Sequence, residues 1–129
     1  MAALSDYAEN LILNWLMKNT GSAPSATYLA LFTAAPNDAG GGTEVSGNGY
    51  ARQAVTWDTA SGTGGTTSNS TAETFTASGG DFGTVTHIGI FDAATSGNLL
   101  WHGAMTSSKT VADGDSLQFA IGAIDLTIA

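Results

Sequence analysis

The stretch that most constrains this sequence is residues 83–105, GTVTHIGIFDAATSGNLLWHGAM. Two runs rich in β-branched and aromatic residues, 84–92 and 99–105, flank a short polar connector at 93–98. Such runs favour strands, and a connector of this length favours an antiparallel hairpin. The sequence therefore predicts that a β-hairpin lies at the centre of the fold.

Pairing Asp92 with Leu99 sets the expected register of this hairpin. Because side chains alternate across a strand, each strand then has two distinct faces. The more apolar face, the candidate sheet core, bears Ile88, Ile90, Leu99, Trp101 and Met105. The opposite face bears Val85, His87, Phe91, Leu100 and His102. Since neither face is clearly polar, we expect both to be partly covered, as in a two-sheet sandwich.

A helix is predicted over residues 5–19. Ser5 can cap its start, acidic residues lie in its first turns and Lys18 lies in its last turn, as the helix dipole favours. Apolar residues at helical spacing form one stripe: Leu4, Tyr7, Ala8, Leu11, Trp15 and Leu16. This stripe is expected either to cover the end or edge of a sheet or to pack on another subunit.

Further strands are predicted at 26–34, 50–57, 71–77 and 116–128, the last with a bend at Gly122. Residues 37–49 and 58–70 are rich in Gly, Ser and Thr and are predicted to be loops. The pattern indicates a mainly β fold, an antiparallel β-sandwich that is jelly-roll-like or an open barrel, with one N-terminal α-helix. The length of 129 residues suits a single domain, with the sandwich at 26–128.

The charge composition limits the partners that the chain can bind. It has 11 Asp and Glu against 3 Lys and Arg, a formal net charge of -8. Because Lys18, Arg52 and Lys109 are scattered, we expect neither nucleic-acid binding through phosphates nor attraction to anionic lipid. No apolar run is long enough to span a membrane, and the N-terminus lacks the basic region of a secretory signal.

Motifs that carry chemistry are missing from the sequence. There is no GxSxG elbow, no Gly-rich phosphate loop with a following Lys, and no cysteine for thiolate metal sites. We therefore expect neither an enzyme nor a bound cofactor. Aromatic stacking on sugar rings is possible at Tyr50 and Trp57, which lie beside long polar loops, although Trp57 equally suits a core position.

Two histidines form the main candidate metal site. In the predicted register His87 and His102 are diagonal neighbours on one face, with their α-carbons about 7–8 Å apart. They could share a metal with Asp81 or Asp92, or form a pH-sensitive contact. The alternative is that they are two polar side chains on a solvent-facing or subunit-facing surface.

Four runs of the sequence resemble a group of small tailed-bacteriophage virion proteins. These runs are YLALFTAAP at 28–36, TEVSGNGYARQAV at 43–55, HIGIFDAATSGNLLWHG at 87–103 and GDSLQF at 114–119. Members of the group are labelled tail-fibre-like or head decoration (cement) proteins. The likeness extends over residues 6–128. It implies a structural component of a phage particle and carries over no catalytic residues.

Two hypotheses follow, and both place the protein in the virion. In the first, it is a capsid decoration protein on the outside of the head, an oligomer such as a homotrimer that clamps the major capsid protein. The expected contacts come from the helix stripe and residues 37–49: Leu4, Tyr7, Leu11, Trp15, Asp38, Glu44 and Val45. In the second, it is a tail-associated receptor- or carbohydrate-binding module that contacts a host glycan through Tyr50 and Trp57. We favour the capsid surface.

Overall fold

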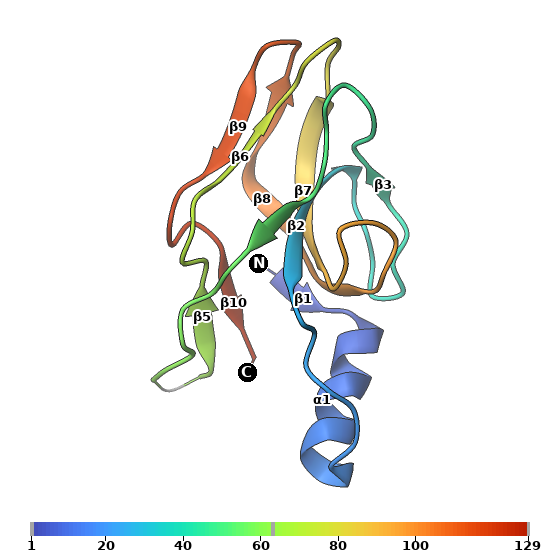
Figure 1. Ribbon diagram of the computed structural model, residues 1–129, viewed down its shortest axis with the longest axis vertical. Helices are drawn as coiled ribbons and strands as arrows, with labels where there is room; N and C mark the ends of the chain where they lie inside the picture. The colour runs from blue at the N-terminus through green and yellow to red at the C-terminus, as the bar shows by residue number, and fades with distance from the viewer. Residues whose placement is uncertain (1, 63, 129) are drawn as a thin grey trace.

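The computed structural model describes residues 2–62 and 64–128, which are mainly β-strand with one helix near the N-terminus (Figure 1). The elements in chain order are β1 (Ala2–Leu4), α1 (Asp6–Lys18), β2 (Thr27–Ala34), β3 (Thr43–Glu44), β4 (Gln53–Val55), β5 (Thr66–Ser68), β6 (Glu73–Thr76), β7 (Gly83–Phe91), β8 (Leu99–Val111), β9 (Ser116–Phe119) and β10 (Asp125–Thr127). The predicted fold class is confirmed. No helix in the described ranges is long and apolar enough to cross a bilayer.

The strands form one large sheet and two small ones, all antiparallel. The large sheet has the order β1-β8-β7-β2-β3, and β4 also pairs with β2. The pairs β6–β9 and β5–β10 form two-stranded sheets that lie beside it in Figure 1. Buried side chains from all three sheets form one apolar cluster that includes Leu29, Ile90, Phe75, Leu117 and Leu126. The described strands thus pack as layers around one core and do not close into a barrel.

Strand β2 is the most buried strand, as its sequence predicts. Its four central residues, from Leu29 to Phe32, are buried whichever face they are on. β2 pairs with β7 on one side and with β3 and β4 on the other. A strand enclosed in this way needs apolar side chains on both faces, which explains its unbroken apolar run.

Strands β7 and β8 form the predicted hairpin, and much of its register is confirmed. The pairs Ile88–Gly103 and Ile90–Trp101 are present as expected. β8 continues beyond the predicted end at Met105 as far as Val111. The irregular register between these two strands accommodates the extra length of β8.

The predicted pairing of Asp92 with Leu99 is wrong by one residue. A β-bulge after Ile90 pairs Phe91 with Leu99 instead. A one-residue shift moves side chains to the other face of a sheet. Leu100 therefore joins the main core cluster, whereas Leu99 is buried on the opposite face.

Two segments predicted as loops contain strands. Residues 58–70 include β5, which pairs with β10, and residues 37–49 include β3, which pairs with β2. In the first case Thr66 lies opposite Thr127 and their hydroxyl oxygens are 3.1 Å apart. β-branched residues and cross-strand hydroxyl pairs favour a strand even where little apolar surface is available.

The predicted strand at 116–128 is two strands rather than one. β9 and β10 are separated by a turn in which Gly122 has a φ of +78°, a conformation that favours glycine. Gly122 donates its backbone N–H to the carbonyl of Asn69. The predicted bend at Gly122 is therefore a complete break in pairing, and it sends β9 and β10 to different partner strands.

Helix α1 has the predicted N-cap, but most of its apolar stripe is not packed on the sheet. The Ser5 side chain accepts a hydrogen bond from the Ala8 backbone N–H, and the helix ends at Asn19 in the left-handed conformation. Figure 1 shows α1 projecting from the base of the β-structure. The expectation that the stripe covers a sheet edge holds for Ala8, the one buried residue of α1, but not for Trp15 and Leu16, which are exposed.

Candidate functional site

The most connected polar cluster consists of Glu44, Tyr50 and Arg52. Arg52 Nε and Nη2 donate to the two carboxylate oxygens of Glu44 at 2.9 and 2.8 Å, and Tyr50 Oη donates to Glu44 at 2.6 Å. Arg52 Nη1 donates to the carbonyls of Ala93 at 2.9 Å and Ser96 at 2.8 Å. This cluster, here called the Arg52 brace, joins the β3 region to the β7–β8 connector.

The charges of the brace stabilise one another. Burial alone would raise the pKa of Glu44, but hydrogen bonds from Arg52 and Tyr50 outweigh it and hold that pKa below its usual value. Burial and the bond to Glu44 raise the pKa of Tyr50, and the bond to Glu44 raises the pKa of Arg52. The guanidinium also lies 3.6 Å from the centre of the Phe91 ring. At neutral pH the brace is thus an ion pair with a neutral phenol.

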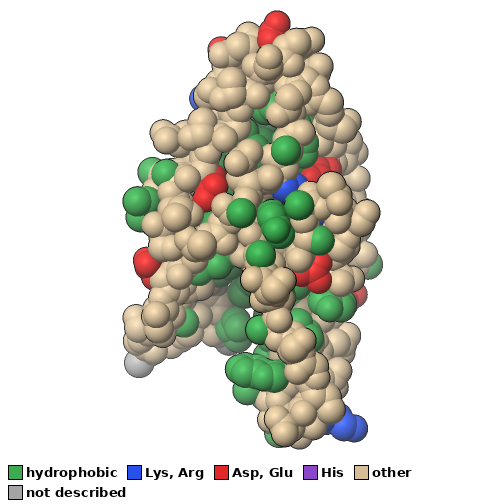
Figure 2. All heavy atoms as spheres, in the orientation of Figure 1, with side chains coloured by type: hydrophobic (Ala, Val, Ile, Leu, Met, Phe, Trp, Pro, Cys, Tyr) green, Lys and Arg blue, Asp and Glu red, His purple; other side chains and the backbone are tan. Residues whose placement is uncertain are grey.

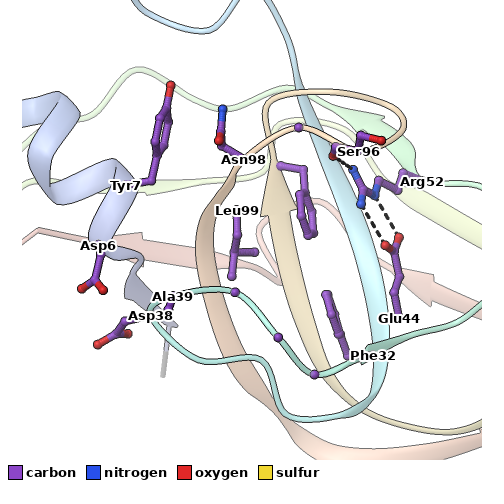
Figure 3. A pocket seen from close by; sticks show the side chains of 15 residues that line it. Asp6, Tyr7, Phe32, Asp38, Ala39, Glu44, Arg52, Ser96, Asn98 and Leu99 are labelled. Atoms are coloured by element: carbon purple, nitrogen blue, oxygen red, sulfur yellow. Dashed lines mark hydrogen bonds and ion pairs between the residues drawn. The ribbon is translucent and has the colours of Figure 1, made fainter.

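An open groove of about 640 Å³ lies between the brace and the start of α1 (Figure 3). Its floor includes the apolar side chains of Phe32 and Leu99, and Tyr7 lies on its α1 side. Asp6 and Asp38 lie close together at one end in Figure 3. The groove therefore offers hydrogen-bond acceptors beside an apolar floor, which suits a ligand or chain segment with donor groups.

The two histidines share a face of the β7–β8 hairpin, as the predicted register requires. His102 Nε2 lies 2.8 Å from Asp38 Oδ1, and His87 Nδ1 lies 2.8 Å from Thr86 Oγ1. His102 therefore ties the loop after β2 to β8. The partner of His102 is Asp38 rather than either acid that the sequence analysis paired with the histidines.

Those two acids, Asp81 and Asp92, make other contacts. Asp81 accepts the backbone N–H of Asp113, and Asp92 accepts both the backbone and the side chain of Asn98. In residues 2–62 and 64–128 no group of three or more His, Cys, Asp or Glu side chains could hold a metal ion. The two histidines therefore make contacts that hold the fold together, His102 with Asp38 and His87 with Thr86.

The outer half of α1 carries several exposed apolar side chains. The start of the helix is fixed to the sheet by the backbone N–H of Ser5, which donates to Leu100 at 2.9 Å. Beyond Ala8 the helix leaves the β-structure. Four apolar residues are then exposed: Leu13 (59%), Trp15 (57%), Leu16 (64%) and Met17 (78%). Figure 2 shows hydrophobic side chains gathered on this projecting part.

Comparison with protein families adds a finding that the geometry alone does not give. Residues 3–127 match the family described as podophage GP4 fiber I protein gp80. The chain belongs to this family. It is a phage virion component and a structural protein of tail-fibre-like type, which confirms the resemblance to tailed-phage virion proteins. A comparison with curated proteins gives no match.

The two predicted glycan-stacking residues of this fibre protein point into the structure. The Tyr50 ring stacks on Phe75 and meets Phe82 edge-on, with ring centres 6.0 and 5.8 Å apart. Trp57 packs against the core and donates its Nε1–H to Thr27 Oγ1 at 2.9 Å. Tyr50 and Trp57 are half-buried and do not form a shared exposed platform, so the core interpretation describes Trp57 better.

The predicted interface residues are in four different settings. Tyr7 and Trp15 are exposed on α1, while Leu4 in β1 and Leu11 in α1 are half-buried. Asp38 and Glu44 line the groove. Val45 is buried in the core and is not available to a partner.

Sequence analysis missed two features of the fibre protein. Leu13 and Met17 lie off the predicted stripe, although the uncharged run NLILNWLM at 10–17 signals a helix that is apolar on most sides. The Arg52 brace was missed because Arg52 completes its hydrogen bonds on the carbonyls of Ala93 and Ser96, which are 41 and 44 positions away in sequence. Only the spacing of Glu44, Tyr50 and Arg52 at alternate or nearby positions gave a signal.

Proposed function

We propose that this protein is a structural component of the fibre apparatus at the phage tail and that it is not an enzyme. The family match over residues 3–127 supports the fibre role, and the Arg52 brace, the most connected polar cluster in the described part of the chain, supports a structural rather than a reactive role. Its hydrogen bonds connect segments of the protein to one another. Such a cluster stabilises a shape.

The bonding within the brace argues against a reactive role. Both carboxylate oxygens of Glu44 accept hydrogen bonds from Arg52, and one also accepts from Tyr50. A general base needs an oxygen that can reach a substrate proton. Here the lowered pKa of Glu44 and its occupied oxygens favour a permanent ion pair instead.

Membership of a fibre family supports the tail rather than the head as the position of the protein. The same β-rich structural module could instead lie on the head, where a capsid decoration protein clamps the major capsid protein. Host-glycan binding through Tyr50 and Trp57 is not part of the proposal, because both rings are packed inward.

Labelling of intact virions tests the proposed position. An antibody raised against the purified protein, followed by gold labelling and electron microscopy, should mark the tail region, and pre-immune serum should not. A regular array of label over the head would overturn the proposal and support capsid decoration. Cryo-electron microscopy of the same particles would then show whether the density of this chain lies on the capsid or on the tail.

A further inference from the structure

We propose that the outer half of α1 is a self-association surface, which packs against α1 of other copies of this chain. The surface consists of the exposed residues Leu13, Trp15, Leu16 and Met17 together with a neighbouring hollow. This inference is independent of whether the protein lies on the tail or on the head.

The buried side of α1 continues into an exposed region. Ala8 and Trp15 are seven residues apart, about two turns, and therefore lie on the same side of α1. Ala8 is 5% exposed against the sheet, whereas Trp15 is 57% exposed. At the Trp15 end, the segment 22–24 of the same chain lines a hollow beside this side of the helix and leaves more than half of the Trp15 surface exposed.

This half of the helix is apolar over most of its circumference. Residues 10–17 contain no charged side chain, and their two polar residues, Asn10 and Asn14, are four residues apart and share one side. Successive side chains point about 100° apart, so Leu13, Leu16 and Met17 face directions that Trp15 does not. An apolar side of a helix is normally buried against another element. One neighbouring helix covers one side only, and a trimer is the smallest bundle in which every helix meets two others.

The exposed side of α1 also has a shape that could fit its own copy. A hollow of about 200 Å³ with apolar lining atoms lies between Leu11, Ile12 and Trp15 of the helix and residues 22–24 of the following segment. Trp15 also projects from the same patch. A surface that carries both a protruding ring and an apolar hollow can be complementary to its own copy, as symmetric assembly requires.

The chain also exposes more surface than a compact monomer of its mass. Its exposed area is 7009 Å², whereas a monomer of 13.0 kDa is expected to expose about 6300 Å². The excess agrees with a helix that projects from the β-structure and could be covered by a partner.

Charge favours a second copy over a basic partner. With a net charge of -8, copies repel one another over most of their surface. The uncharged run at 10–17 is where two copies can approach without that repulsion. A basic partner would instead gain most at the groove, where Asp6 and Asp38 lie together.

Single substitutions on the helix test the proposal. We expect the purified protein to have a mass in solution of at least three times 13.0 kDa by light scattering. Leu16→Glu and Met17→Glu would bury a charge in the contact and should weaken association by at least about tenfold. Ile121→Glu is the matched control, because Ile121 is 67% exposed on the β9–β10 turn and away from α1. Circular dichroism checks that each variant is folded.

Cross-linking gives a second readout, because the chain has no cysteine. Leu13→Cys should form an intermolecular disulfide in mild oxidant at least about tenfold faster than Ile121→Cys. A wild-type protein that stays at 13.0 kDa at all concentrations would overturn the proposal. An oligomer that persists in both folded Glu variants would also overturn it. The same holds if the Glu variants leave self-association unchanged and weaken only binding to another virion protein.

Discussion

At the scale of single residues, Asn69 shows how one buried polar side chain organises two strands. It is 0% exposed. Its Nδ2 donates to the carbonyls of Thr71 at 2.8 Å and Ala120 at 2.9 Å, and its Oδ1 accepts the N–H of Ile124 at 2.9 Å. Because it satisfies backbone groups on both sides of the β9–β10 turn, Asn69 fixes where β9 ends and β10 begins.

The substitution Asn69→Ala should therefore be strongly destabilising. It removes the side-chain partner of the carbonyls of Thr71 and Ala120 and of the N–H of the buried Ile124, and leaves a cavity at a fully buried position. We therefore expect the free energy of unfolding to fall by about 2–4 kcal/mol. Urea denaturation followed by fluorescence measures the change. Asn10→Ala is the control, since Asn10 is exposed on α1 and its loss should cost less than about 1 kcal/mol. Equal effects of the two substitutions would contradict this account.

Gly89 matters at the same scale because of space rather than conformation. A Cβ atom built there would lie 2.8 Å from a ring carbon of Phe32 and 3.0 Å from a methyl carbon of Leu99. Both neighbours line the floor of the groove. The absence of a side chain at Gly89 thus lets two large residues from β2 and β8 meet over β7.

Gly89→Ala should overpack this contact and lower the free energy of unfolding by about 1–3 kcal/mol. Thermal unfolding measured by circular dichroism checks the prediction. Gly114→Ala is not a suitable control, because Gly114 has a φ of +86°. Ala104 is exposed on the same hairpin face, so Ala104→Gly is the control and should have a much smaller effect on stability. If Gly89→Ala were as stable as the wild type, Phe32 and Leu99 would have to be able to move aside.

At the scale of elements, the sequence predicts the parts whose pattern is local. The unbroken apolar run of β2, the Ser5 cap and the two-strand alternation of the hairpin each depend on residues close in sequence. The pairing of β5 with β10 does not, because Thr66 meets Thr127 across 61 positions and neither run is apolar. The bulge that pairs Phe91 with Leu99 was also hidden, since the run Leu99–Trp101 opposite it is apolar throughout and shows no break in alternation.

The Arg52 brace was equally hidden, and for a related reason. Arg52 completes its bonds on the backbone carbonyls of Ala93 and Ser96, and any residue has a carbonyl. The sequence singled out Glu44 as an interface candidate, but it gave no sign that the β7–β8 connector would lie beside Glu44 and Arg52. Local patterns therefore predicted the elements, and long-range hydrogen bonds decided how the loops close.

The brace predicts a specific dependence of stability on pH. The pKa of Glu44 is lowered in the folded protein, so its contribution is complete above its usual value of 4.5 and is lost as the pH falls through the lower folded value. Glu44→Gln should cost about 1–3 kcal/mol at pH 7, because Arg52 loses its charged partner. Urea denaturation between pH 7 and about pH 2 should show the difference between the two proteins shrinking at acid pH. A constant difference would exclude the ion pair as its source.

At the scale of the whole molecule, two properties act against each other. The net charge of -8 repels copies from one another, and in the proposed association the exposed half of α1 draws them together. Figure 1 shows that α1 and the β5–β10 pair extend from the same end of the β-structure, which gives the chain an uneven outline rather than a sphere. The exposed area of 7009 Å² reflects that outline.

Salt should therefore strengthen the proposed association. The Debye length falls from about 30 Å at 0.01 M to about 3 Å at 1 M, so repulsion between acidic copies is screened while apolar contact is kept. Sedimentation velocity across this range should show a larger oligomeric fraction at high salt. Dissociation on adding salt would instead indicate contacts made by charged pairs.

The narrow attachment of α1 has a mechanical consequence. Between the helix and the sheet the backbone links are the N–H of Ser5 to Leu100 and the N–H of Asp6 to Asp38, both within two adjacent residues. If helices of several copies are bundled, any force on one β-body is transmitted to the bundle through this joint and through residues 19–26, which lead from α1 to β2. Bending of the assembly would then concentrate at these two connections, and each body could tilt while the bundle stayed intact.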